Sequence, residues 1–330
     1  LRVKNKPDYK AMRMQALRIA TWFWVQHSYG IVGRKQYTTA AKRVGLHPGG
    51  QLFLVYLPVL LSFIPEGFAQ HYFSYNTEVQ GVYAQLMDLN LPAAAQQLEH
   101  LAQSQPDNLA QWHLQDYHAF LRVYTSDEEA LYQALKKNRQ ACLRMLELGP
   151  EDSPWTLYTQ ADVHLHWAYL KFQFGDYFAG FLEVKKAFHL LEKNQQRFPE
   201  FTPNDKHLGI LYTLIGTVPD QYQWGIRLLS GLEGSVEQGQ KALESSLEPG
   251  QPAAAFLTGE SRLLYSYLLV YLGWDYEAAW RLLRPLQSDS SRPVLATFIY
   301  ANVAFRSGHN DEAIQALQSA RQRAGWQHFP

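Results

Sequence analysis

Ionisable side chains that could act on a metal or a substrate come close together at only a few points of the sequence. His164 and His166 flank Leu165 in a stretch with helical character. Two histidines that bind one metal ion from a single helix face need a spacing of three or four, so a spacing of two predicts ordinary helical positions. The acidic pairs Glu128-Glu129 and Glu151-Asp152 lie at expected helix starts, where carboxylates interact favourably with the helix dipole. We therefore expect neither a metal site nor a catalytic acid–base pair from these residues.

Nucleophilic chemistry also lacks a recognisable motif. No G-x-S-x-G turn occurs, and Ser230 and Ser235 have no Asp/His pair arranged around them in a known pattern. Cys142 is the only cysteine, which excludes an internal disulfide and a cysteine-based zinc site, and its apolar surroundings predict a buried position. Gly231 and Gly234 are not followed by the lysine and hydroxyl residue of a phosphate-binding loop. The sequence thus predicts no catalysis and no cofactor; the alternative is an enzyme whose residues meet only in three dimensions.

The composition is that of a chain with a large core and balanced charge. Of the 330 residues, 47% are hydrophobic, and 30 basic residues offset 30 acidic ones. A nucleic-acid-binding protein needs a basic excess or a basic stripe, and neither is visible here. We expect a protein or peptide partner rather than a nucleic acid.

The elements that must position these side chains are predicted to be helices throughout. Apolar residues recur at helical spacing from Tyr75 onward, and no stretch alternates with period two, so we expect an all-α fold with essentially no sheet. The breaks between stretches are short, which favours antiparallel helix pairs. The expected helices are Tyr75–Leu89, Ala93–Ser104, Leu109–Tyr124, 125–148, Trp155–Phe174, Tyr177–Arg197, Asp205–Val218, Gln221–Leu229, Ser235–Leu247, Pro252–Leu272, Tyr276–Leu286, Pro293–Arg306 and Asp311–Ala324.

A short sequence motif recurs where one expected helix ends and the next begins. Gly175, Gly273 and Gly308 are each followed by polar or aromatic residues and then by a small residue one helical turn on. The last two glycines are 308 − 273 = 35 positions apart, close to the ~34-residue period of tetratricopeptide repeats (TPRs). The chain therefore resembles TPR proteins, whose helical hairpins stack into a superhelical solenoid. A generic helical array is the alternative.

Small residues lie where the TPR pattern requires two helices to cross closely. Close approach needs small side chains at the crossing and large apolar ones around it. In the pair around Gly273 the register is open by one residue, between Ser266 and Tyr267 and between Ala278 and Ala279. The matching positions of the other two pairs are Ala168, Gly180 and Ala187, and Ala301, Ala313 and Ala320.

An apolar run, Leu52–Ile64, is too short to span a bilayer, which needs ~20 residues. It is followed by small residues at Gly67 and Ala69, the −3 and −1 positions of a secretory cleavage site before Gln70. Basic residues precede it at Arg34, Lys35, Lys42 and Arg43. We expect residues 34–69 to be an export signal, cleaved between Ala69 and Gln70.

The export signal defines the predicted domains and compartment. Residues 1–33 form an upstream extension that need not belong to the mature protein, and residues 70–330 form the TPR-like domain. Export with a single cysteine suits a bacterial periplasm or cell envelope, with no membrane span in the mature chain. The alternative is a cytosolic or membrane-associated protein in which Leu52–Phe68 is retained as a docking helix.

A more specific resemblance covers about residues 155–330. An apolar run from Gly209 ends at Pro219, and a glycine-rich segment with Gly225, Gly231, Gly234 and Gly239 follows. This order resembles the tetratricopeptide-repeat protein 39 / inclusion-body-clearance family, in which a glycine-rich helical insert follows such a proline before the repeats resume. The resemblance implies a TPR-like architecture and no catalysis.

Resemblance to TPR proteins also implies where a partner binds. The first helix of each pair lines the concave face, and polar and aromatic side chains there suit an extended or helical peptide. We therefore expect a non-catalytic scaffold or adaptor. The candidate binding residues are Asp162, Leu165, Tyr169 and Phe172 in one repeat and Leu295, Phe298, Asn302 and Phe305 in another.

Overall fold

The computed structural model describes residues 70–218, 231–248, 252–272, 275–286 and 292–328. The expected export signal at 34–69, the cleavage residue Ala69 and the expected helix Gln221–Leu229 lie outside these residues. Within the described residues the fold is all-helical, as predicted, and the only β-type pairing is an isolated bridge between Tyr72 and Asn108.

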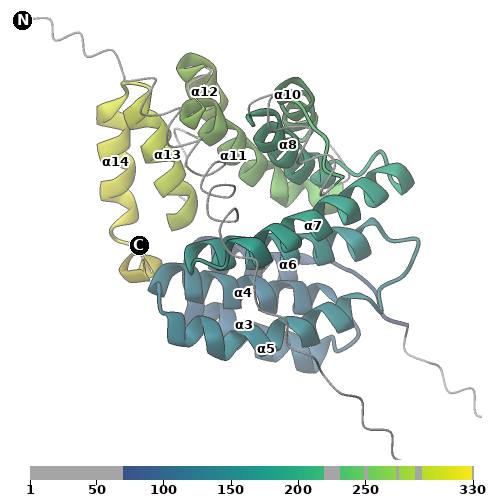
Figure 1. Ribbon diagram of the computed structural model, residues 1–330. Helices are drawn as coiled ribbons and strands as arrows, with labels where there is room; N and C mark the ends of the chain where they lie inside the picture. The colour runs from purple at the N-terminus through teal and green to yellow at the C-terminus, as the bar shows by residue number, and fades with distance from the viewer. Residues whose placement is uncertain (1–69, 219–230, 249–251, 273–274, 287–291, 329–330) are drawn as a thin grey trace, which may run out of the picture.

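The helices follow the predicted order closely (Figure 1). The α-helices are α2 (Thr77–Met87), α3 (Leu91–Ser104), α4 (Ala110–Ser126), α5 (Glu129–Leu146), α6 (Pro154–Gln173), α7 (Tyr177–Arg197), α8 (Pro203–Gly216), α10 (Val236–Ser245), α11 (Thr258–Tyr271), α12 (Tyr276–Leu283), α13 (Val294–Arg306) and α14 (Asn310–Ala320). Short 3₁₀ turns cover Pro252–Leu257, Arg284–Leu286 and Ala324–His328.

One expected helix start is wrong. The hydroxyl residues at 125 and 126 do not begin α5, because α4 continues through Ser126. The Thr125 hydroxyl donates back to the carbonyl of Leu121, and Asp127 ends α4 in the left-handed conformation at φ 53°. Ser and Thr that bond to a carbonyl four residues earlier extend a helix instead of capping the next one.

Two of the recurring glycines make the turns of helix pairs. Gly175 between α6 and α7 and Gly308 between α13 and α14 have φ values of 80° and 85°, which favour glycine over any residue with a side chain. Gly273 lies outside the described residues. At the α6–α7 crossing, a Cβ added to Gly180 would lie 2.4 Å from the Phe172 ring, so this close approach depends on glycine.

The small residues expected at helix crossings are buried. In the α11–α12 pair, Ser266 and Ala279 are buried whereas Tyr267 and Ala278 are half-buried, so burial favours one residue from each of the two registers and does not choose between them. The other buried small residues are Ala168, Gly180, Ala187, Ala301, Ala313 and Ala320.

Contacts between successive helix pairs close the described helices into a ring. Helix α4 packs between α2 and α6, α7 packs on α8, and α11 packs on both α8 and α13. Helix α13 then packs on α2, so the two ends of the described chain meet (Figure 1). A linear repeat array requires contacts only between neighbouring repeats, so this closure is an additional feature of the present chain.

Polar contacts at Asp88, just after α2, fix the closure. One carboxylate oxygen of Asp88 accepts from the backbone N–H of Val294 at 3.1 Å, which caps the start of α13, and from Arg323 Nε at 2.6 Å. These contacts join residues more than 200 positions apart. Loss of Asp88 would therefore loosen the ring without removing core residues.

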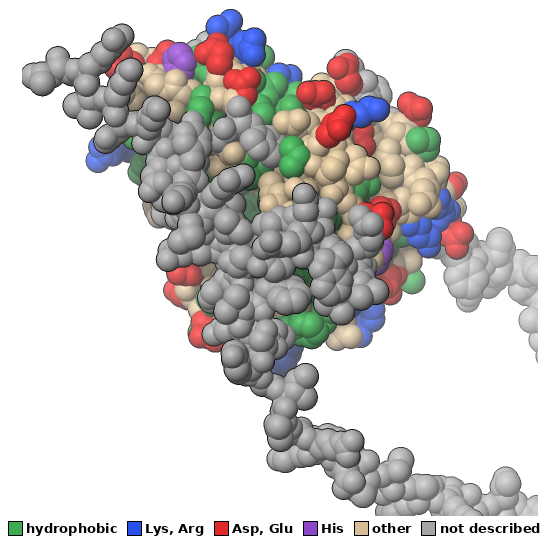
Figure 2. Space-filling model, turned by 45° about the horizontal axis from the view of Figure 1, so that its top comes forward, with side chains coloured by type: hydrophobic (Ala, Val, Ile, Leu, Met, Phe, Trp, Pro, Cys, Tyr) green, Lys and Arg blue, Asp and Glu red, His purple; other side chains and the backbone are tan. Residues whose placement is uncertain are grey.

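The surface carries charge of both signs. Where Figure 2 shows described side chains, acidic and basic ones are interspersed without a broad patch of one sign. None of the helices in the described residues has the length and apolar character needed to cross a bilayer.

Candidate functional site

Among the described residues, three histidines from three helices of the ring converge on Asp162 of α6. His113 of α4 places Nε2 2.8 Å from Asp162 Oδ2, and His166, one turn along α6, places Nε2 3.8 Å from the same oxygen. His207 of α8 places Nε2 3.0 Å from Asp162 Oδ1, in a polar contact without hydrogen-bond geometry. All four side chains are at most 10% exposed. Asp162 thus contacts side chains of α4, α6 and α8 at the centre of the ring.

The network extends in both directions from these histidines. Tyr75 Oη lies 2.7 Å from His113 Nδ1, so a Tyr75–His113–Asp162 chain of hydrogen bonds runs through the interior. With His113 Nε2–H donating to the carboxylate, Nδ1 accepts the tyrosine proton. On the other side, Asp116 of α4 contacts His166 Nδ1 at 3.0 Å and accepts from the Trp167 indole at 2.8 Å.

The buried charges shift one another's pKa values. Burial alone would raise the pKa of Asp162, but His166, His207 and His113 outweigh it and hold that pKa well below its ordinary value. Burial would lower the pKa of His166, but Asp162 and Asp116 outweigh it and raise that pKa above its ordinary value. Burial and the neighbouring Lys206 lower the pKa of His207 despite its contact with Asp162, which keeps His207 neutral.

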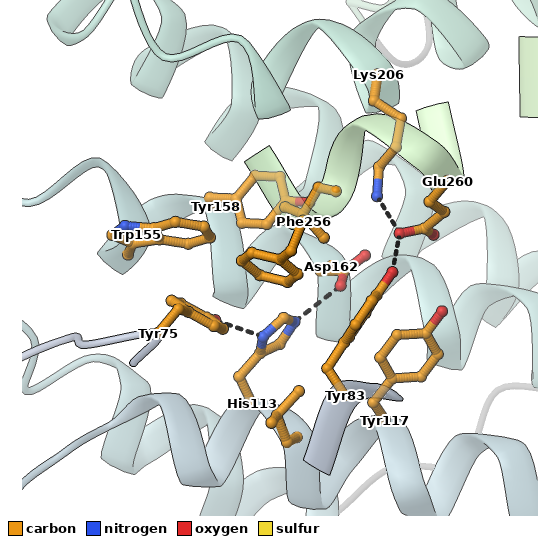
Figure 3. Close-up of a pocket in the computed structure, with 12 residues that line it drawn as sticks. Tyr75, Tyr83, His113, Tyr117, Trp155, Tyr158, Asp162, Lys206, Phe256 and Glu260 are labelled. Carbon is orange, nitrogen blue, oxygen red and sulfur yellow. Dashed lines mark hydrogen bonds and ion pairs between the residues drawn. The ribbon is translucent and has the colours of Figure 1, made fainter. Parts of the chain in front are cut away.

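A small cavity lies beside this network (Figure 3). Its volume of about 10 Å³ is close to the least space that holds one water molecule. Lys206 of α8 reaches Glu260 of α11 at 3.1 Å, and the Tyr83 hydroxyl of α2 donates to the same carboxylate at 2.8 Å. Aromatic side chains fill the rest of the lining, namely Tyr75, Tyr83, Tyr117, Trp155, Tyr158 and Phe256. This cavity, as the described residues line it, has no room for a substrate or a peptide strand.

A second buried network connects α5, α6 and α7 through Glu183. This carboxylate contacts His164 at 2.5 Å and Lys171 at 2.6 Å, and it also pairs with Arg139. Burial would raise the pKa of Glu183, but hydrogen bonds from His164 and Lys171 and the charge of Arg139 lower it to about 2. His164 and His166 thus belong to different networks, as their spacing of two residues implies.

Four tyrosines lie on the inner face of the ring, further out than Asp162. We call these residues, Tyr124, Tyr169, Tyr267 and Tyr271, the tyrosine surface. Tyr124 and Tyr169, from α4 and α6, meet edge to face at 5.4 Å between ring centroids, and Tyr267 and Tyr271 of α11 stack at 4.0 Å. Tyr124 contributes to the raised pKa of Tyr267, after burial and Tyr271, so the two pairs lie within electrostatic range of each other. Tyr169 is 48% exposed, so a partner can reach this surface.

Helix α13 completes the tyrosine surface. Asn302 accepts a hydrogen bond from the Tyr271 hydroxyl at 3.0 Å, and the Arg306 guanidinium lies over the Tyr271 ring at 4.4 Å. Phe305, on the same helix, is 67% exposed. Burial and the neighbouring Tyr124 raise the pKa of Tyr169 to about 12, so its hydroxyl stays neutral and able to donate. The surface therefore offers rings and hydroxyl groups on rigid helices.

The eight candidate binding residues divide between these regions. Tyr169 belongs to the tyrosine surface, Asn302 accepts a hydrogen bond from its Tyr271, and Phe305 is an exposed residue on the same helix as Asn302. Asp162 is only 6% exposed, because the closed ring covers it. Half-buried side chains make up the rest: Leu165 and Leu295 pack against the main core, Phe172 lies under Gly180, and Phe298 is in α13.

Sequence reasoning missed the convergence on Asp162. The spacing of four between Asp162 and His166 is a visible signal, because it places an acid and a base on one helix face. His113, His207 and the Lys206–Glu260 pair come from other helices, and their approach depends on ring closure. No group of His, Cys, Asp and Glu within the described residues is arranged to hold a metal ion.

Comparison with known proteins yields no match to a family model, to a curated protein or to a solved structure. The function must therefore be argued from the geometry of this chain.

Proposed function

We propose that the chain is a non-catalytic, TPR-like helical scaffold that binds a protein or peptide at the tyrosine surface. The observation that carries this is the accessible aromatic area formed by α4, α6, α11 and α13, on which Tyr169 is 48% and Phe305 67% exposed. Tyrosine provides a large contact area and a hydroxyl group at a small cost in conformational entropy, and it is enriched at binding surfaces.

The arrangement of the inner face supports this location. In a TPR-like array the first helices of the pairs line the binding face, and here α4, α6, α11 and α13 are such helices. The part of that face around Asp162 is closed by its own polar contacts, which leaves the tyrosine surface as the accessible part. A partner would thus contact Tyr169 and Phe305 rather than Asp162.

An enzyme is the second candidate, favoured by the convergence of ionisable groups on Asp162. The cavity of about 10 Å³ beside them is too small for a substrate, and the lining aromatic side chains pack it closely. The cluster is more readily explained as the polar centre that joins the helices of the ring.

Export remains part of the proposal, on the pattern of residues 34–69 alone. In the exported form the chain begins at Gln70 and acts in a bacterial periplasm or cell envelope. If Leu52–Phe68 is retained, the scaffold is cytosolic or membrane-associated. Intact mass and N-terminal sequencing of protein recovered from its own cells distinguish a start at Gln70 from a chain that keeps this segment.

Peptide selection tests the binding site directly. Peptides selected from a random display library on the purified chain should lose affinity about tenfold or more when Tyr169→Ala and Phe305→Ala are combined. Ile314→Ala, which removes an equally exposed apolar side chain from α14, is the matched control and should leave binding unchanged. Selected peptides that bind the double variant as tightly as the wild type would refute this placement.

A further inference from the structure

Helix α7 presents a continuous stripe of exposed side chains on the outer side of its pair with α6. We define the α7 stripe as Phe178, Leu182, Lys186, His189 and Lys193, all of which are exposed. Their spacings of four, four, three and four residues place them along one helix face. At ~1.5 Å per residue, the stripe is roughly 22 Å long.

The stripe changes character along its length. Its first two members are large and apolar, with Phe178 57% and Leu182 41% exposed. Its other three are two lysines and a histidine, and Lys185 lies beside them. Cations near a helix C-terminus interact favourably with the dipole, which explains Lys193 but not the exposed Leu182.

A hollow of about 360 Å³ lies in the middle of the stripe. Ala179 and Leu182 provide apolar walls, and Lys185, Lys186 and His189 lie on its cationic side. The remaining lining residues, Lys171 and Glu183, are paired with each other at 2.6 Å. The hollow thus combines an apolar wall with the ammonium groups of Lys185 and Lys186.

The acidic groups nearby do not cancel this charge. Glu183 is held by Lys171, His164 and Arg139 in the interior, so its charge is already balanced. Glu192 lies 3.8 Å from His189 and is the carboxylate of α7 closest to the stripe. Partial burial and, less strongly, Glu233 raise the pKa of Glu192, although His189 opposes them.

We propose that the α7 stripe binds an acidic amphipathic segment of a partner protein, with an apolar side chain of that segment in the hollow and its carboxylates beside Lys185, Lys186 and Lys193. Positive charge around an apolar hollow is complementary to such a segment. This site lies on α7 and is independent of the tyrosine surface. A bilayer is the less suitable occupant, because it offers no side chain for the hollow and two apolar residues bury little area in lipid.

The test uses a synthetic helical peptide about 18 residues long, which matches the stripe at ~1.5 Å per residue. It carries Leu and Phe on one face and Glu beside them, and a matched peptide has Gln in place of every Glu. Fluorescence anisotropy with the full chain should show saturable binding of the acidic peptide, weakened by added salt. The Gln peptide should bind about tenfold more weakly or not at all.

Variants of the chain locate the site. Phe178→Ala with Leu182→Ala should weaken the acidic peptide about tenfold, and so should Lys186→Glu with Lys193→Glu. Leu148→Ala, which removes an exposed apolar side chain after α5, should have no effect, and circular dichroism should show that all variants fold. The combination of Tyr169→Ala and Phe305→Ala should also leave this affinity unchanged, which separates the two sites.

Several outcomes would overturn the proposal. Equal affinity for the acidic and Gln peptides would remove the charge argument, and equal affinity of wild type and stripe variants would place the peptide elsewhere. Binding to anionic lipid vesicles that depends on Phe178 and Lys186, without binding of the acidic peptide, would replace the protein partner with a membrane.

Discussion

Replacing Asp162 by asparagine should strongly destabilise the fold, because three imidazoles depend on this one carboxylate. Asparagine keeps the size of the side chain and an oxygen that can accept from His113, so no cavity forms. It removes the negative charge that raises the pKa of His166 and that His207 contacts at 3.0 Å. Removing one partner of a buried ion pair costs about 3–5 kcal/mol. For a domain of this size, that loss lowers the midpoint of thermal unfolding by roughly 6–20 °C.

Urea unfolding at pH 7, followed by circular dichroism and tryptophan fluorescence, measures the loss. The pKa of Asp162 is depressed, so its contribution is fully present above the ordinary aspartate pKa of about 3.9 and is lost as the pH falls through the lowered value. A double variant, Asp162→Asn with His166→Gln, should lose less than the sum of the single variants, with a coupling of about 0.5–3 kcal/mol.

An exposed pair of the same type is the control. His309 lies 3.6 Å from Glu312, with each side chain more than 30% exposed. Glu312→Gln should cost no more than about 1 kcal/mol, because water and salt screen an exposed pair. If Asp162→Asn were as mild as Glu312→Gln, the view of Asp162 as the centre that joins α4, α6 and α8 would be wrong.

Three further predictions concern the pH response, the ring closure and the α6–α7 crossing. Because the pKa of His207 is lowered in the folded state, the folded state loses stability as the pH falls below about 6.5. The pKa of His166 is raised instead, so His166 stabilises the folded state below about pH 6.5, and this stabilisation is lost as the pH rises through the pKa that His166 has in the folded state. His207→Gln should therefore flatten the acid-side loss in thermal midpoints measured across this pH range, and His166→Gln should steepen it. Asp88→Ala should lower the free energy of unfolding by about 1–3 kcal/mol, because Val294 N–H and Arg323 lose their shared acceptor. Amide hydrogen exchange at the start of α13 should become faster. Unchanged exchange there would contradict the closure of the ring. Gly180→Ala should destabilise the fold by about 1–3 kcal/mol, because the added Cβ would meet the Phe172 ring. Gly81→Ala in α2 is the control, because a Cβ there has nothing within 4 Å. In the same denaturation assay it should stabilise the fold by about 0.4–1 kcal/mol.

Local patterns in the sequence were enough to predict the helices. The turn at Gly175 and the buried small residues at Gly180 and Ala187 follow from requirements on single residues and on one helix pair. The break at Asp127 was misplaced because a Ser or Thr can bond backward along its own helix as readily as forward to the next one. The predicted buried position of Cys142 is confirmed.

The centre of the ring could not be predicted from local patterns. His113, Asp162 and His207 are 49 and 45 positions apart in turn, and they meet only because α4, α6 and α8 pack around one axis. Closure of α13 on α2 involves still longer separations and determines which part of the inner face stays accessible. For that reason Tyr169 and Phe305 remain plausible contacts for a partner, while Asp162, proposed on the same pattern, is buried.

Site-specific photocrosslinking in the native host tests the central claim most directly. A photoreactive amino acid replaces Tyr169 or Phe305 in the full chain, and Asp162 or Ile314 in two control versions. Binding at the tyrosine surface predicts the same crosslinked partner from positions 169 and 305 and none from positions 162 and 314. Crosslinks from position 314 but not from 169 or 305 would show that partners bind elsewhere on the molecule and would contradict the proposed function.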